Sequence, residues 1–243
     1  MSGTLGTGQL SGPLRAALAS LLTLLLVGGC SAEEPLAEFL EREEKKYSQN
    51  DEELLIRHFF RDRRGGVFVD VGAFQWRKYS TTFYLEEQLG WSGLAIDANA
   101  RLAAGYAKNR PNTRFYSYIV TDRSGTEEEF FLAGPISSTS KEHIEGLGRE
   151  GREVAVETIT LDELLDQAGI ESIDFLSMDI EGGEPRALAG FDIERFRPKL
   201  ICIEAGSPGT RESTGPYFEQ HGYERIEEYL PYDPVNWYYR PRD

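Results

Sequence analysis

The sequence predicts an α/β fold in which a mostly parallel, twisted sheet is covered by helices on both faces. Short apolar runs bounded by glycine alternate along the chain with stretches of helical length and pattern. This alternation is typical of parallel strands joined by crossover helices. The last two strand-like segments have no helix between them. They predict an antiparallel edge at the C-terminal end of the sheet.

The first half of this domain is predicted from clear local signals. The run Val67–Val71 lies between Gly66 and Gly72 and indicates a buried strand. Hydroxyl side chains that can cap a helix precede the apolar pattern that follows. We expect a helix over residues 80–89, a second strand over 93–97, a helix over 101–109 and a third strand over 114–120.

The second half continues the alternation. Gly169 is placed to end a helix, because glycine readily adopts the left-handed conformation found at helix C-termini. We expect strands over residues 127–132, 154–159, 173–178 and 199–204, helices over 161–168, 185–189 and 216–221, and a closing antiparallel pair over 223–229 and 236–240.

The overall charge argues against a nucleic-acid partner. The chain has 26 Lys and Arg against 41 Asp and Glu, which gives a formal net charge of −15. A surface this acidic repels phosphate backbones. The chain has only two cysteines, Cys30 and Cys202, and three histidines, so the sequence shows no disulfide framework and no zinc motif. We therefore predict no metal site.

The N-terminal segment predicts a membrane association. Residues 14–27 are almost all apolar, and a run of this length is short for a spanning helix, which needs about 20 residues. The following sequence Leu26-Val27-Gly28-Gly29-Cys30 resembles a bacterial lipobox, in which the cysteine is lipidated. An uncleaved anchor with the domain facing the cytoplasm, or a misplaced start codon, are the alternatives. The predicted organisation is a signal peptide with lipobox or an anchor over residues 1–30, a charged tether and entry helix over 31–60, and the main domain over 61–243.

Acidic residues and glycine gather where the predicted strands end. Ligands of an open parallel sheet bind beyond the carboxyl ends of its strands, so these positions are candidates for a binding site. The candidates are Asp70, Gly72 and Ala73 at the first strand, Asp97 at the second, Asp122 after the third, Asp179 and Glu181 after the fourth, and Glu204 at the fifth. For each acid the alternative is a solvated residue or a helix cap.

The turn after the first strand does not fit a dinucleotide. A dinucleotide fingerprint needs Gly-x-Gly-x-x-Gly to cradle a pyrophosphate, whereas Gly72 is followed by Ala73-Phe74-Gln75-Trp76. Asp97 lies about 25 residues beyond Gly72, where a carboxylate can accept hydrogen bonds from ribose hydroxyls. An acid-lined site with one glycine suits a cationic sulfonium nucleoside better than it suits NAD.

Four segments in this order resemble the FkbM family of methyltransferases. They cover about three quarters of the chain, from residue 65 to 230. The segments are Phe68-Val69-Asp70-Val71-Gly72-Ala73, Leu89-Gly90-Trp91-Ser92-Gly93-Leu94-Ala95-Ile96-Asp97, Glu157-Thr158-Ile159-Thr160-Leu161-Asp162-Glu163-Leu164, and Ile173-Asp174-Phe175-Leu176-Ser177-Met178-Asp179-Ile180-Glu181-Gly182-Gly183-Glu184. The family commonly has Asn and Gly after the first turn, where this chain has Phe74-Gln75-Trp76, and Glu-Pro where it has Asp97-Ala98.

The resemblance implies a Rossmann-like methyltransferase fold with S-adenosylmethionine as cofactor. It implies cofactor binding by Asp70, Gly72, Ala73 and Asp97, and Asp179 and Glu181 at the catalytic end. The family's usual reaction is O-methylation, so we expect a small-molecule or carbohydrate hydroxyl as acceptor.

Two side chains and two other functions remain as alternatives. His143 is either a general base or a solvated loop residue, and Trp76 either walls the pocket or packs in the core. A non-catalytic, membrane-anchored lipoprotein that uses the fold as a binding module is the second function. An NAD-dependent oxidoreductase is disfavoured, because the chain lacks the glycines and a Tyr-x-x-x-Lys pair.

Overall fold

The computed structural model describes residues 34–206 and 208–242. From residue 35 onward, the described residues form one compact unit. The apolar segment 14–27 and Cys30 therefore lie outside the described residues. Within the described part of the chain, no helix is both long and apolar enough to cross a membrane.

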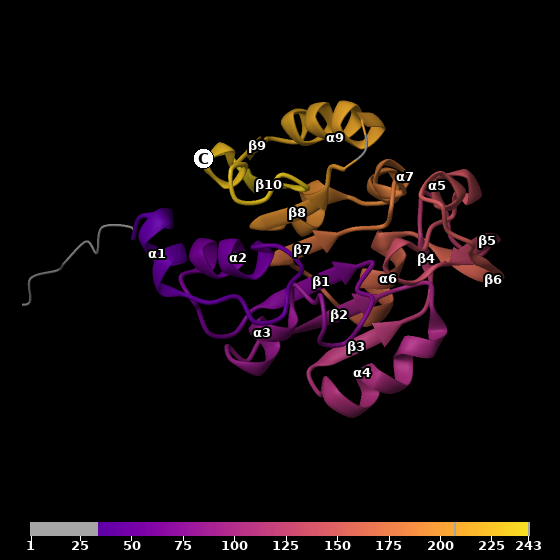
Figure 1. Cartoon of the computed structure of the whole chain (residues 1–243), viewed down its shortest axis with the longest axis horizontal. Helices are drawn as coiled ribbons and strands as arrows, with labels where there is room; N and C mark the ends of the chain where they lie inside the picture. Colours follow the sequence, from indigo (N-terminus) through magenta and orange to yellow (C-terminus); the bar gives the residue numbers. More distant parts are fainter. Residues whose placement is uncertain (1–33, 207, 243) are drawn as a thin grey trace, which may run out of the picture. The chain divides into compact units, whose positions relative to one another are not determined.

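A mostly parallel sheet with an antiparallel edge forms the centre of the domain, as predicted, and it has seven strands (Figure 1). The predicted strands 127–132 and 154–159 do not belong to it, because they pair with each other in a second sheet. The order of the seven-stranded sheet is β3-β2-β1-β7-β8-β10-β9, in which the first five strands are parallel neighbours and β10 pairs antiparallel with both β8 and β9. The strands are β1 (Val67–Val71), β2 (Ser92–Ile96), β3 (Thr113–Tyr116), β7 (Phe175–Met178), β8 (Leu200–Glu204), β9 (Tyr223–Arg225) and β10 (Asn236–Pro241). The strand order reverses direction at β1, which lies between β2 and β7.

Helices cover both faces of this sheet because the central strands are apolar on both sides. Val69 and Val71 of β1 pack with α6 (Leu161–Ala168), α7 (Glu184–Ala189), α8 (Ile193–Phe196) and α9 (Pro208–Gln220). Phe68, on the opposite face, packs with α2 (Glu52–Phe60) and α3 (Phe83–Glu87). Ala95 on that face packs with α4 (Ala103–Asn109), which follows the 3₁₀ turn η1 (Ala100–Leu102). The predicted fold class is confirmed.

The predicted third strand is wrong as a single element. Residues 113–116 form β3 in the large sheet, whereas β4 (Ile119–Val120) pairs with β6 (Arg152–Ile159) in a second sheet of order β4-β6-β5. The chain leaves the large sheet at Ser117, whose hydroxyl donates to the Ala98 carbonyl. β5 (Glu127–Leu132) completes the small sheet, antiparallel to β6. The segment 114–120, which was predicted as one strand, therefore contributes to two sheets.

The segment before β1 folds onto the domain. We expected residues 31–60 to be a charged tether and an entry helix. The described part contains α1 (Leu36–Arg42) and α2, and both contribute buried side chains to one core cluster, including Leu36 and Ile56. Arg57 is buried as well, where it pairs with Glu43 and Asp62. In the sequence, the many charged residues of this segment obscure its amphipathic pattern. In the fold, charges such as that of Arg57 are paired, and the apolar residues pack into the core.

The chain after β8 carries a longer helix than we predicted. The prediction placed its start at Pro216, since proline favours the first turn of a helix. The helix α9 begins at Pro208 and contains Pro216 in its interior. Two 3₁₀ turns, η2 (Gly134–Ile136) and η3 (Glu227–Tyr229), and α5 (Lys141–Gly146) complete the elements of the described chain. α5 lies beside β5 and β6 (Figure 1).

Candidate active site

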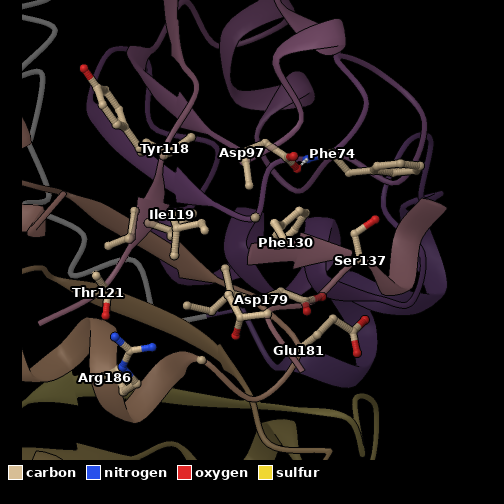
Figure 2. A pocket seen from close by; sticks show the side chains of 18 of the residues that line it. Phe74, Asp97, Tyr118, Ile119, Thr121, Phe130, Ser137, Asp179, Glu181 and Arg186 are labelled. Atoms are coloured by element: carbon tan, nitrogen blue, oxygen red, sulfur yellow. Dashed lines mark hydrogen bonds between the residues drawn. The ribbon is translucent and has the colours of Figure 1, made fainter. Parts of the chain in front are cut away.

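A cavity opens at the carboxyl ends of β1, β2 and β7. Its volume is about 680 Å³, counted with the open space at its mouth. Asp97 and Phe74 lie on one side of it, and Asp179 and Glu181 lie on the opposite side (Figure 2). β4, β5 and the loop after β5 supply the remaining wall through Tyr118, Ile119, Val120, Thr121, Phe130, Gly134, Pro135, Ser137 and Thr139.

Gly72 brings three strand ends together. Its φ is +86°, and a Cβ atom built there would lie 1.7 Å from the carbonyl oxygen of Asp179. The amides of Gly72 and Ala73 both donate to the carbonyl of Ile96 at the end of β2. Any side chain at position 72 would push β7 away from β1. The glycine that the sequence suggested for cofactor approach is thus also required for backbone packing.

Asp97 combines a structural role with a place on the cavity wall. Its Oδ2 accepts a hydrogen bond of 2.9 Å from the Phe74 amide, and its Oδ1 accepts one of 2.8 Å from the Asn99 amide. Burial raises the pKa of this carboxyl, while the hydrogen bonds from the two backbone amides oppose that rise. A carboxylate has about four acceptor positions, so two remain for a ligand. The capping interpretation and the ligand-binding interpretation are therefore compatible.

Asp70 and Ala73 lie behind the cavity wall, not on it. Asp70 accepts a 2.8 Å hydrogen bond from the Thr82 hydroxyl at the start of α3. Burial raises its pKa to about 6, against the effects of Thr82 and Arg110. The carbonyl of Ala73 accepts from the Tyr106 hydroxyl of α4. The structure does not place either residue among those that line the cavity. Both hold the turn that carries Gly72.

Asp122 is exposed and also lies outside the cavity lining. One of its oxygens lies 3.1 Å from a guanidinium nitrogen of Arg186 on α7. Glu128 of β5 binds the same guanidinium through both of its oxygens, at 2.7 and 2.9 Å. Arg186 does line the cavity, beside Thr121 (Figure 2). Asp122 thus connects to the site through Arg186.

Asp179 belongs to a cluster of carboxyl groups. Oxygens of Asp179, Glu184 and Glu204 all lie within 4.8 Å of one another. The Asp179 side chain is exposed at the cavity, but the protein atoms packed around it, followed by the charges of Glu204 and its neighbours, raise its pKa well above the usual value. Burial and the charges of Glu184 and Glu181 raise the pKa of Glu204 to about 7. Carboxyl groups this close repel one another when ionised, so protonation within the cluster is favoured.

Glu184 is the member of this cluster that the sequence analysis did not single out. It is fully buried at the start of α7, where one of its oxygens accepts from the Ile180 amide at 2.9 Å. Thr210 of α9 donates to its other oxygen. Among the described residues, the three acids have a spacing that could hold a metal ion. The absence of a metal site stays a prediction.

Glu181 has a different environment from Asp179. Its Oε2 lies 3.0 Å from Nε2 of His143 on α5, and its backbone carbonyl accepts from the Ser138 hydroxyl at 3.1 Å. Its φ is +54°, a conformation that few non-glycine residues adopt. The loop after β5 thus binds the backbone of Glu181 through Ser138, and α5 binds its side chain through His143. His143 lies at the site, although it does not line the cavity itself.

Trp76 packs in the core instead of walling the cavity. Its ring contacts Phe83 edge to face, and it belongs to the cluster around Ala73 and Tyr106. The cavity residues that the sequence did not indicate include Phe74, Phe130, Ser137 and Arg186. Phe74 follows the glycine turn directly, and this position was a usable signal. The others come from β5, its following loop and α7, which only the three-dimensional fold brings to the strand ends.

Comparison with known proteins gives one family. The methyltransferase FkbM domain matches residues 70–233. This match includes Asp70, Asp97, Asp179, Glu181 and Glu204. No curated protein matches the chain.

Several solved structures are similar to the chain at low sequence identity. Precorrin-6y C5,15-methyltransferase from Geobacter metallireducens has 14% identity and a TM-score of 0.48, covering 82% of this chain and 93% of its own. A TehB-like SAM-dependent methyltransferase from Corynebacterium glutamicum has 15% identity and a TM-score of 0.45, covering 85% and 94%. A SAM-dependent methyltransferase from Geobacter sulfurreducens, in complex with S-adenosyl-L-homocysteine, has 11% identity and a TM-score of 0.40, covering 83% and 79%.

These TM-scores lie below 0.5, so the identification depends on the domain match and not on the solved structures. That match spans more than half of the 243 residues. The chain therefore belongs to the FkbM family of S-adenosylmethionine-dependent methyltransferases.

Proposed function

We propose that this protein binds S-adenosylmethionine in the cavity and transfers its methyl group to a hydroxyl of a small molecule or carbohydrate. The observation that carries the proposal is that three strand ends meet at one cavity. The glycine turn at Gly72, the acid Asp97 and the acid Asp179 come from three different strands and meet at one cavity. This is the switch point of the sheet, where ligands of open α/β sheets bind.

The cavity offers a suitable place for each part of the cofactor. Asp97 keeps free acceptor positions for the ribose hydroxyls. Apolar side chains for the adenine are close to it, including Ile96, Ala98 and Ile119. The methionine part would then extend past Gly72 toward Asp179 and Glu181. Methyl transfer from an already activated sulfonium needs mainly positioning, so few catalytic side chains are required.

The charges around the cavity favour a neutral acceptor. Among the described residues that line it, Arg186 is the one cationic side chain, and Glu128 and Asp122 already bind its guanidinium. Asp97, Asp179 and Glu181 are acidic. A phosphate or carboxylate on the acceptor would find no unpaired cation at this wall. A sugar or a small hydroxyl compound has no such need.

Calorimetric titration of the full chain with S-adenosylmethionine and S-adenosylhomocysteine tests the proposal. Both ligands should bind, and Asp97→Ala should weaken them by about 1.5–3 kcal/mol, the scale for lost hydrogen bonds to a charged group. Asp166→Ala is the matched control, because that carboxylate pairs with Arg195 on the surface and lies outside the cavity lining. If the wild-type chain bound neither ligand, a non-catalytic role of the fold would replace this function.

We also propose that Cys30 is lipidated and anchors the protein to a membrane. The support is the lipobox-like sequence directly after the apolar run 14–27, and acyl chains contribute about 0.8 kcal/mol per buried methylene. Cys30→Ser should lose acyl labelling and remain unprocessed. Labelling and mass equal to those of the wild type would instead favour an uncleaved anchor, with the domain facing the cytoplasm.

A further inference from the structure

The two acids on the Asp179 side of the cavity have different neighbours. Asp179 has Glu184 and Glu204 within 4.8 Å, and the repulsion among these carboxyl groups favours their protonated forms. Glu181 has a histidine as its partner, at 3.0 Å. Burial raises the pKa of Glu181, and the hydrogen bond from His143 opposes that rise. Glu181 is therefore the acid of this wall that has a basic partner to favour its ionised form.

The position of Glu181 is fixed by contacts at both ends of the residue. The Ser138 hydroxyl holds its backbone carbonyl, and His143 holds its carboxylate. Ser140 caps α5 by accepting from the His143 amide, so the histidine is itself held in place. A carboxylate fixed in this way needs little reorganisation to face a ligand charge. Prearranged charges of this kind act strongly in partly desolvated sites.

The cofactor changes its charge during the reaction. S-adenosylmethionine carries a positive sulfonium, and its demethylated product has a neutral thioether. In the binding mode of the proposed function, the sulfonium lies toward the Asp179 side of the cavity. We propose that Glu181, held by His143, is the counter-ion of this sulfonium, so that the protein binds the charged methyl donor more tightly than the uncharged product.

This inference rests on the proposed function and has its own consequence for His143. The titratable groups that face Glu181 are His143 from α5, Asp179 from the β7–α7 turn, Glu184 from the start of α7, and Glu204 from β8. His143 is the basic member of this set, so the preference for the donor over the product should depend on its hydrogen bond to Glu181. A preference set by the overall charge of −15 would not depend on this histidine.

The test compares the affinities of the full chain for S-adenosylmethionine and S-adenosylhomocysteine by calorimetry. At mildly alkaline pH, where histidines are neutral, the wild type should bind the donor more tightly. Glu181→Gln should reduce the ratio of the two affinities by roughly tenfold, as expected for the loss of one charge near a partly screened cation. Retained binding of the product shows that the variant is folded.

A second set of variants tests whether His143 holds Glu181 in place. His143→Gln can still donate a hydrogen bond to Glu181, so the affinity ratio should stay high, whereas His143→Ala cannot hold the carboxylate and should reduce the ratio. His221→Ala is the matched control, because His221 forms a surface pair of similar length, 3.1 Å, with Glu194. The control should keep the affinity ratio of the wild type.

Two results would overturn the inference. An affinity ratio that Glu181→Gln leaves unchanged, with both ligands still bound, would remove Glu181 as the counter-ion while the proposed function stands. An affinity ratio that His143→Ala leaves unchanged would show that the Asp179 cluster, and not this pair, sets the preference. Absence of binding to the wild-type chain would instead refute the proposed function.

Discussion

Asp97 and Asp179 occupy equivalent positions at the ends of parallel strands, yet the protein treats them differently. Two backbone amides donate hydrogen bonds to the carboxylate of Asp97, one to each oxygen. Asp179 faces other carboxyl groups, and its pKa is raised by the protein atoms packed around it and by Glu204. Asp97 is therefore positioned to accept further hydrogen bonds, whereas the surroundings of Asp179 favour its protonated form. The neighbours of a strand-end acid, more than its position, decide its chemistry.

The largest expected effect comes from the residue that holds these two regions together. Gly72→Ala places a methyl group against the Asp179 carbonyl and requires a left-handed φ of +86° from an alanine. We expect a loss of more than about 3 kcal/mol in the free energy of unfolding, since strain and a backbone clash add. Chemical denaturation measures it.

Gly169→Ala is the matched control for this variant. Gly169 also has a positive φ, at +67°, but a Cβ atom there would meet no atom within 4 Å. It should lose only about 1 kcal/mol, the usual cost of the backbone conformation alone. Equal losses in the two variants would mean that the contact between β1 and β7 has no special weight.

The sequence predicts the main sheet well, because each central strand is an apolar run of its own. Residues 67–71 form β1 of the main sheet with the predicted bounds, and in the rest of the fold residues 127–132 form β5 of the small sheet and 161–168 form a helix as predicted. Local patterns also locate Asp97 and Asp179 at strand ends. The split at Ser117 could not be predicted in this way, because two strands with a two-residue break have the same local pattern as one strand.

The site itself was predictable only in part. Asp70 lies between Val69 and Val71, and side chains alternate along a strand, so its carboxyl faces α3 instead of the cavity. His143 and Glu181 are 38 residues apart, and their contact depends on how the loop after β5 folds back. No local signal distinguishes this histidine from His221, which pairs with Glu194 on the surface.

The second-largest effect is the pH dependence of stability that comes from the carboxyl cluster of Asp179, Glu184 and Glu204. Glu204 has a pKa of about 7 in the folded protein, against about 4.3 in an unfolded chain. Because its folded pKa is raised, its contribution to stability is full below the unfolded value and is lost as the pH rises to about 7. Glu204→Gln stays neutral, so the variant should gain about 1–2 kcal/mol over the wild type above this window.

Thermal unfolding at a series of pH values checks this expectation. The two proteins should have similar stability in acid and diverge between about pH 4 and 7. Glu194→Gln is the control, since that carboxylate is exposed. Parallel curves for wild type and Glu204→Gln would show that the carboxyl cluster does not raise the pKa of Glu204.

The smallest expected effect is that of a chelator. Asp179, Glu184 and Glu204 have the spacing of a metal site, but Glu184 already accepts from the Ile180 amide and the Thr210 hydroxyl. The pKa values of Asp179 and Glu204 are raised, so these carboxyl groups bind a proton readily. A bound proton relieves the repulsion between them, and a metal cation is then not needed for this purpose. We therefore expect EDTA to leave both cofactor affinity and thermal stability unchanged. Loss of either with EDTA, with recovery on adding magnesium or calcium, would make the cluster a metal site. The contrast between Asp97 and Asp179 would then be one between a ribose ligand and a metal ligand.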